Sequence, residues 1–234
     1  MSIAYHSAYA TRIGHSREVI FAGDNVRLAG QTDYPEMRTP AGGFPLLFLL
    51  PNTHCNTRDD VEPLAEVGVD AGFAVFRWDR RGTGRSGAGG AGSTTQDAVE
   101  AYETALHQPQ INRRQVIIVA QGAGTGLLGS AYGLFARVQP PHAALLISSL
   151  LDPTAIQALD TRIHIIQGEN DWNPWQTYSQ AACRAHRAIY PHGATYTMLP
   201  GLDHDLMSQD PLLPGLHPLT RSAIGDWLRM AAPR

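Results

Sequence analysis

The stretch GFAVFRWDRRGTGRSG, residues Gly72–Gly87, is the part of this sequence that decides its fold. It contains a short continuous apolar run, Ala74–Trp78, which leads into a charged turn rich in glycine. Continuous apolar runs, as opposed to alternating ones, are typical of parallel strands that are covered on both faces of a sheet. Ala74–Trp78 is therefore predicted to be a buried strand.

Similar runs recur on both sides of this stretch and alternate with helical patterns. The other predicted strands are Leu46–Leu50, Val116–Val119, Ala143–Ile147, Ile163–Ile166 and Thr195–Leu199. The predicted helices are Asp59–Ala71, Thr95–His107, Thr125–Val138, Thr177–Tyr190 and Arg221–Met230. Strands that alternate with helices indicate βαβ units and a doubly wound, mostly parallel α/β sheet.

The N-terminal part follows a different pattern. The β-rich runs Arg17–Ile20 and Val26–Gly30 flank a turn at Gly23–Asn25, which predicts an antiparallel hairpin ahead of the parallel sheet. Between the strands Ala143–Ile147 and Ile163–Ile166, the segment is too short to hold a cap domain. The active face is therefore expected to be open.

Bulk composition restricts the class of protein. A chain of 234 residues fits one α/β domain spanning residues 1–234, and 43% hydrophobic with 17% charged residues is ordinary for a globular protein. The net charge of −3 gives no indication of a nucleic-acid partner or an anionic membrane surface. The first 15 residues lack a basic segment followed by an apolar run, and no apolar stretch reaches the length of a membrane span. A cytoplasmic location is the expectation.

Two segments resemble the α/β-hydrolase fold family. Gly72–Gly87 is similar to that family's strand-and-loop signature, and EVIFAGDNVRLAG (Glu18–Gly30) is similar to its first hairpin. The resemblance covers nearly the whole chain, in order and with sensible spacing. It implies a sheet whose loops carry a nucleophile elbow, an acid, a histidine and an oxyanion hole.

The elbow departs from the family's pattern at its central residue. After the strand Val116–Val119, the five elbow positions are Ala120-Gln121-Gly122-Ala123-Gly124, with small flanks that allow a sharp strand-to-helix turn. Gly122 stands at the nucleophile position and carries no hydroxyl, thiol or carboxylate. Because glycine tolerates the strained backbone of an elbow, the turn is expected to fold without its usual serine.

The acid and the base have clear candidates. Asp171, in QGENDWNP, follows the strand Ile163–Ile166, where the resemblance places the acid; Asp152, after the preceding strand, is the weaker alternative. His204, in LPGLDHDL, follows the last strand and lies 33 residues after Asp171. The family's order of nucleophile, acid and histidine is thereby kept.

The oxyanion hole has one firm donor and one open position. The backbone N–H of Ala123 is the first donor, and the second comes from the loop PNTHCNTRDD, residues 51–60. Aligned by Pro63-Leu64, this loop has Asn52-Thr53 where the family usually has His-Gly, which leaves the second donor between His54 and Thr53.

Three residues near the expected mouth of the site are candidates for substrate binding. Trp172 and Trp175 are expected to line the entrance, although plain packing is about as good an explanation. His54-Cys55 lacks a second ligand pair at metal spacing, and a cysteine nucleophile would have to lie on the elbow. Cys55 is therefore interpreted as a packing or pocket-wall residue, an accessible thiol being the alternative, and no metal site is predicted.

The run Gly124-x-Gly126-x-x-Gly129, which follows a predicted strand, has the glycine spacing of a dinucleotide-binding fingerprint. A true fingerprint needs an acidic residue at the end of the next strand, and Asp152 comes too late for that role. The match is interpreted as a coincidence, and no cofactor is expected.

The expected function is hydrolase chemistry on a small-molecule ester, thioester, lactone or amide, with weak or absent turnover because of Gly122. Three explanations of Gly122 remain: a serine hydrolase with Ser→Gly at its nucleophile, an enzyme whose His204 and Asp171 act directly on water or substrate, or a non-catalytic relative that binds a ligand or partner. Ser at position 122 is expected to create or raise ester hydrolysis at an elbow-strain cost of about 1–3 kcal/mol.

Overall fold

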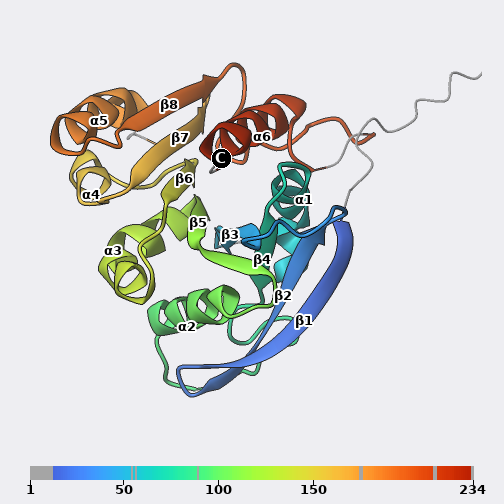
Figure 1. Cartoon of the computed structure of the whole chain (residues 1–234). Coiled ribbons are helices and arrows are strands. Elements are labelled where there is room, and N and C mark those ends of the chain that lie inside the picture. Colours follow the sequence, from blue (N-terminus) through green and yellow to red (C-terminus); the bar gives the residue numbers. More distant parts are fainter. Residues whose placement is uncertain are drawn as a thin grey trace, which may run out of the picture.

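The computed structural model describes residues 13–53, 55, 57–88, 90–173, 176–212 and 215–232, without the side chains of residues 176 and 177. In this part of the chain eight strands form one sheet in the order β1-β2-β4-β3-β5-β6-β7-β8 (Figure 1). Their bounds are β1 Ile13–Gly23, β2 Val26–Pro35, β3 Phe44–Leu50, β4 Ala74–Trp78, β5 Ile111–Gln121, β6 Ala143–Ile147, β7 Arg162–Gly168 and β8 Ala194–Leu199. β1 pairs with β2 and β2 with β4 in antiparallel fashion, and all the remaining pairs are parallel.

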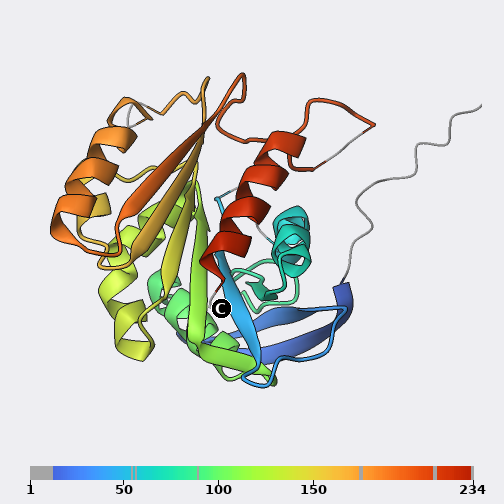
Figure 2. The ribbon, with the colours of Figure 1, turned by 45° about the horizontal axis from the view of Figure 1, so that its top comes forward.

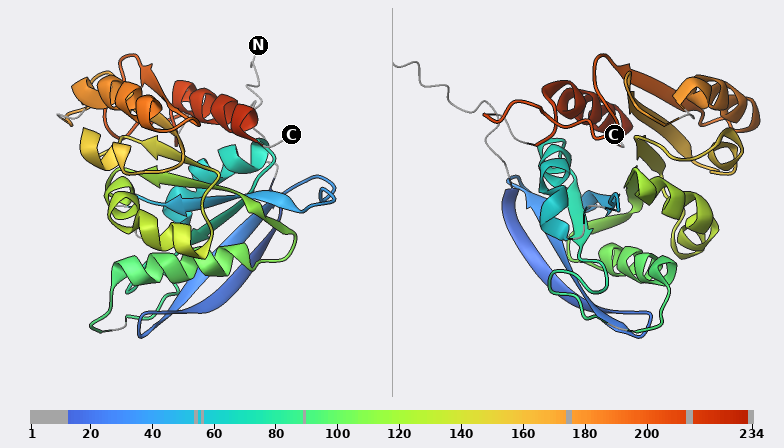
Figure 3. Two further views of the ribbon diagram at one scale, coloured as in Figure 1. Left: turned by 60° about the vertical axis from the view of Figure 1, so that its left-hand side comes forward. Right: turned by 180° about the vertical axis from the view of Figure 1, so that it is seen from behind.

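Helices cover both faces of this sheet. Their bounds are η1 Arg58–Val61 (a 3₁₀ helix), α1 Glu62–Asp70, α2 Thr94–Leu106, α3 Ala123–Val138, α4 Pro153–Gln157, α5 Gln176–Ile189 and α6 Pro218–Ala231. Figures 1 and 2 show α1 and α6 on one face and α2, α3 and α5 on the other, and the two further views in Figure 3 agree. The two main hydrophobic clusters divide in the same way, one beneath α1 and α6 and one beneath α2, α3 and α5.

The apolar composition of the central strands follows from this double cover. Every residue of β4 and of β6 is buried, so neither face of these strands tolerates a solvated side chain. On the α2–α3 side, Phe48 of β3 packs edge-on against Tyr102 with ring centroids 5.1 Å apart, and Tyr102 packs in the same way against Phe135 at 5.4 Å. Such rings anchor the two helices on the sheet.

The predicted architecture, a mostly parallel doubly wound sheet with an N-terminal antiparallel hairpin, is confirmed. The hairpin strands are much longer than Arg17–Ile20 and Val26–Gly30. Side chains of β1 are mostly exposed, so its outer half has no apolar pattern and is held by backbone pairing to β2. β5 also begins earlier than predicted, at Ile111. Its first residues are partly or fully exposed, so they carry no continuous apolar run that would have marked them as a strand.

Two helices differ from the prediction: α4 was not predicted, and α6 begins earlier than expected. Between β6 and β7, where residues 148–161 are all described, the chain forms only the five-residue α4, which leaves no cap domain there. The last helix begins at Pro218 and not at Arg221, because proline is favoured at the first turn and the His217 side chain caps the helix by accepting the N–H of Leu219. Among the described residues no helix is long and apolar enough to cross a bilayer.

Candidate active site

A sharp turn joins β5 to α3 at Gly122. The backbone of this residue has φ 50° and ψ −119°, in the positive-φ region that favours glycine. Its N–H donates to the carbonyl of Ile147 (2.9 Å), and its carbonyl accepts the hydroxyl of Thr125 (2.6 Å). At Gly124 a side chain would run into the carbonyl of Leu50, which explains why that flank must be small. The segment therefore has the geometry of an elbow.

His204 and Asp171 lie together where β8 and β7 end. The Nδ1 atom of His204 is 2.8 Å from Oδ1 of Asp171, and both residues are buried. The hydrogen bond to Asp171 is the largest influence on the imidazole and raises the pKa of His204 above its usual value, against a smaller lowering by burial. The Nε2 atom of His204 has no hydrogen-bond partner in the described part of the chain. It is free to exchange a proton with a ligand.

Asp171 is held in place by its own loop. Its Oδ1 atom accepts the N–H of Asn173 (2.9 Å), and its Oδ2 atom receives a longer bond from Nε2 of Gln167 (3.4 Å). Gln167 in turn accepts the hydroxyl of Ser179 (3.0 Å). The alternative acid, Asp152, is exposed and caps α4 by accepting the N–H of Ala155 (2.8 Å). The structure therefore brings Asp171, and not Asp152, to the imidazole.

Close backbone packing positions the loop that carries His204. A side chain at Gly168 would collide with the carbonyls of Leu202 and Asp203, so glycine there lets the two loops touch. The hydroxyl of Ser148, a residue with φ 50° after β6, donates to the carbonyl of His204 (2.5 Å). Contacts from the β6 and β7 loops thus fix the base from both sides.

Asn52, which the sequence analysis used only for alignment, occupies the space above Gly122. A Cβ atom built at residue 122 would lie 2.5 Å from Cγ of Asn52 and 2.6 Å from its Oδ1 and Nδ2 atoms. Its Oδ1 atom accepts the N–H of Ala123 (3.1 Å) and the N–H of Thr53 (2.8 Å). Both described candidates for the oxyanion hole therefore already bind an oxygen atom, that of Asn52. His54, the other candidate donor, lies outside the described residues.

Arg80, in the loop after β4, holds the backbone on which Asn52 sits. Its guanidinium donates to the carbonyls of Pro51 (2.8 Å), Asn52 (2.9 Å) and, more weakly, Thr53 (3.4 Å). Burial lowers the pKa of Arg80. The loop is thus fastened by three carbonyl contacts to one side chain.

The predicted substrate-binding residues have different surroundings. Trp172 is 70% exposed, and its ring lies 4.8 Å from the ring of His204, tilted by 39°. Cys55 is buried in the core beneath α1 and α6, and its thiol pKa is raised, chiefly by burial. Trp175 lies outside the described residues. Of the three predicted residues, Trp172 is therefore the one whose ring is described next to the His204 imidazole, and its role in substrate binding stays a prediction.

Other features of the described residues do not form a second catalytic site. They contain no cluster of three histidine, cysteine or acidic residues that could hold a metal. A Cβ at Gly126 would meet no atom within 4 Å, so this glycine of the fingerprint-like run makes no close approach.

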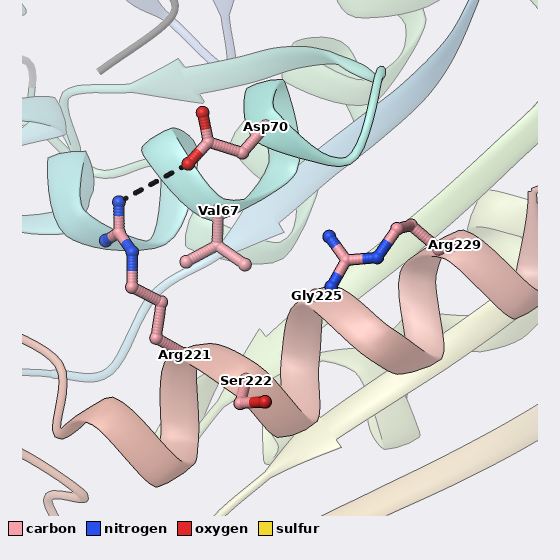
Figure 4. Close-up of a pocket in the computed structure, with 6 residues that line it drawn as sticks. All are labelled: Val67, Asp70, Arg221, Ser222, Gly225 and Arg229. Atoms are coloured by element: carbon pink, nitrogen blue, oxygen red, sulfur yellow. Dashed lines mark ion pairs between the residues drawn. The ribbon is translucent and has the colours of Figure 1, made fainter. Parts of the chain in front are cut away.

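A hollow of about 190 Å³ lies between α1 and α6 (Figure 4). Its two arginines are already paired with carboxylates: Arg221 lies 3.6 Å from Asp70 and 3.1 Å from Glu66, and Arg229 lies 2.7 Å from Asp226. Their charges are compensated within the protein.

Comparisons with known proteins agree on the fold. The structure is similar to the carboxylesterase EstE1 from a metagenomic library (TM-score 0.73, 11% identity, 96% of this chain and 92% of that one). It is also similar to XC6422 from Xanthomonas campestris, an α/β serine hydrolase without a lid (TM-score 0.67, 16% identity, 94% and 96%), and to ATU1826 from Agrobacterium tumefaciens, a putative α/β hydrolase (TM-score 0.67, 19% identity, 93% and 100%). No protein-family model and no curated protein matches the sequence. The chain therefore has the α/β-hydrolase fold.

Proposed function

We propose that this protein is a hydrolase of α/β-hydrolase type in which His204 and Asp171 act as base and acid without a covalent intermediate at residue 122. The observation that carries the proposal is the buried His204–Asp171 contact of 2.8 Å, together with an elbow whose central residue has no side chain. The two are linked through the end of β6, where Ser148 binds the carbonyl of His204 and Ile147 binds the N–H of Gly122. The proposed substrate is a small-molecule ester, thioester, lactone or amide, and the proposed reaction needs no cofactor. The cytoplasm is the proposed location.

The proposed reaction begins at the free Nε2 atom of His204. This atom takes a proton from water, and the water oxygen forms a bond to the substrate's carbonyl carbon while the π electron pair moves to the carbonyl oxygen. Asp171 stabilises the imidazolium that forms. When the tetrahedral species collapses, the bond to the alcohol, thiol or amine breaks, and that leaving group receives the proton from His204. The products are the carboxylic acid and the free leaving group.

The position of Asn52 favours direct attack by water over a serine hydrolase that has lost its serine. A serine at residue 122 would overlap the Asn52 side chain, whereas glycine leaves room for it. Gly122 and Asn52 therefore fit one another in the present structure. Gly122→Ser is therefore expected to cost more than elbow strain alone, because the Asn52 side chain has to move to make room.

The alternative is a non-catalytic protein that binds a ligand or partner in the same place. A binder has no need for a buried imidazole oriented by a carboxylate, since the fold does not require that pair. The arrangement of His204, Asp171 and their supporting contacts is therefore better explained by proton transfer.

A turnover screen tests the proposal. Purified protein is assayed against esters, thioesters, lactones and amides, together with His204→Ala and a control variant, His107→Ala, whose exposed ring lies at the end of α2. We expect turnover that falls about 10²–10⁴-fold in His204→Ala and is unchanged in the control. Turnover that survives His204→Ala would remove His204 from the mechanism, and a complete lack of turnover on the panel would favour the binding alternative.

A further inference from the structure

The orientation of the Asn52 carboxamide is determined by its neighbours. Two backbone N–H groups, those of Ala123 and Thr53, point at one atom of the side chain. Because an N–H group needs an acceptor, that atom is the carbonyl oxygen Oδ1, and the other terminal atom of the carboxamide is the amide nitrogen Nδ2. Asn52 is only 7% exposed, so the orientation is maintained in a buried setting.

The Nδ2 atom of Asn52 is a donor without an acceptor. No residue in the described part of the chain accepts a hydrogen bond from it. It lies 2.6 Å from the point where a Cβ atom of residue 122 would begin, in the space that a nucleophile would enter. Nδ2 is not among the fully buried side-chain atoms of the described residues that lack a partner, so it reaches the surface of the site, where a ligand oxygen can replace water as its acceptor.

The contacts of Oδ1 also strengthen this donor. The Ala123 N–H belongs to the first turn of α3, a 16-residue helix whose N-terminus carries a partial positive charge. Hydrogen bonds accepted by the carbonyl of an amide draw electron density from its nitrogen, since chains of hydrogen bonds polarise one another. The polarity of the two backbone N–H groups is therefore transmitted through Asn52 to its Nδ2 hydrogens.

We propose that Asn52 is a catalytic residue whose Nδ2–H group binds the substrate's carbonyl oxygen as it becomes an oxyanion, in place of the N–H groups that Asn52 itself occupies. This inference rests on the function proposed above and deepens it. It assigns the substrate to carbonyl compounds whose oxygen gains negative charge during the reaction. The three carbonyl contacts from Arg80 keep the Asn52 loop in position for this role.

Two substitutions at Asn52 test the proposal on a substrate found in the turnover screen. Asn52→Asp preserves shape and the two accepted bonds, but it removes the donor and places a negative charge next to the developing oxyanion, so we expect kcat to fall by at least about 10²–10³-fold with a smaller change in KM. Asn52→Ala uncovers the N–H groups of Ala123 and Thr53, so we expect a smaller loss. Asn112→Asp, on the opposite end of β5, is the matched control and should leave kcat unchanged.

Two results would overturn the proposed role of Asn52. If Asn52→Ala raises kcat, the side chain is an obstruction and not a donor. If folded Asn52→Asp, checked by circular dichroism, keeps the wild-type kcat, Nδ2 does not bind the reacting oxygen. Either result overturns the inference but leaves the proposed function standing as long as His204→Ala is inactive.

A binding measurement separates this inference from the proposed function. Methylphosphonate, a small tetrahedral oxyanion, is titrated into ¹⁵N-labelled protein, and the side-chain amide signals of Asn52 are followed by NMR after assignment with Asn52→Asp. We expect these signals to shift in step with binding. Signals that do not move at any concentration contradict the role of Asn52. A shift without turnover on any substrate contradicts the proposed function alone.

Discussion

Replacing Gly122 by serine would introduce the missing nucleophile into a space that is already filled. The new Cβ atom would lie 2.5 Å from Cγ of Asn52, closer than real Cβ contacts allow. At φ 50° a serine also carries backbone strain of about 1–3 kcal/mol. Moving Asn52 aside gives up its bonds from Ala123 and Thr53, at about 0.5–1.5 kcal/mol each. The substitution should therefore cost about 2–6 kcal/mol in total.

The double variant Gly122→Ser/Asn52→Gly removes the overlap. Only the elbow strain of about 1–3 kcal/mol then remains, and the N–H groups of Ala123 and Thr53 become available to a substrate oxygen. Since a domain is usually stable by about 5–15 kcal/mol, we expect the double variant to fold and the single variant to be distinctly less stable. Urea unfolding of both variants measures this difference.

Esterase activity is the functional assay for these variants. We expect the double variant to hydrolyse p-nitrophenyl acetate and to be labelled by a fluorophosphonate probe, and the single variant to do so much more weakly. Adding His204→Ala to the double variant should remove both activities. A folded double variant that is neither labelled nor active, or a single variant with the same labelling and activity, would show that Asn52 does not obstruct a serine at residue 122.

Three further predictions concern titration and loop support. For a substrate that is turned over, kcat/KM should rise with pH through a midpoint above 6.5, because neutral His204 is the base and its pKa is raised; Asp171→Asn should lower both the midpoint and the rate. His164, buried on β7 with its pKa lowered to about 4, is neutral in the folded protein, so the unfolded chain binds more protons between pH 6.5 and 4. The free energy of unfolding should therefore fall by up to about 3 kcal/mol over that range, and urea unfolding of His164→Asn should show a flatter dependence. Arg80→Met should release the Asn52 loop, because it removes the bonds to the carbonyls of that loop. We expect a large fall in kcat, a smaller change in KM, and a lower Tm in a thermal melt.

The pH dependence of stability at His204 has the opposite sign to that at His164. The hydrogen bond to Asp171 raises the pKa of folded His204, so the folded state binds its proton more tightly than the unfolded state. This contribution to stability is fully present below pH 6.5 and is lost as the pH rises through the raised pKa. The two histidines can therefore be distinguished by comparing single variants across the same pH range.

The buried strands could be predicted well from the sequence because a strand that is covered on both faces consists of a continuous run of mostly apolar residues. Ala74–Trp78 and Ala143–Ile147 have the same bounds in the structure as in the prediction, and both are buried throughout. The outer half of β1 was missed because its side chains are exposed, and an exposed paired strand needs no apolar pattern. Short α4 was missed for a similar reason, since only Ile156 in it is buried.

The site was predictable only in part. The order of elements indicated that Gly122, Asp171 and His204 each follow a strand of the same parallel sheet, and in the structure His204 contacts Asp171. Nothing in the sequence fixes how a loop amide is oriented, so the contacts of Asn52 with Ala123 and Thr53 could not be derived from it. The signal that was present is a pair: a glycine at the nucleophile position together with an asparagine, Asn52, in the loop after β3.

In the proposed reaction, His204 drives hydrolysis without an acyl group ever being attached to the protein. The most direct test is rapid-quench turnover of a substrate from the screen, with intact-mass analysis of the protein at each time point, for the native chain and for His204→Ala. We expect product formation without a burst, an unmodified protein mass at every time point, and loss of turnover in His204→Ala. A protein mass increased by the acyl group, or turnover that persists in His204→Ala, would rule out direct attack by water at His204.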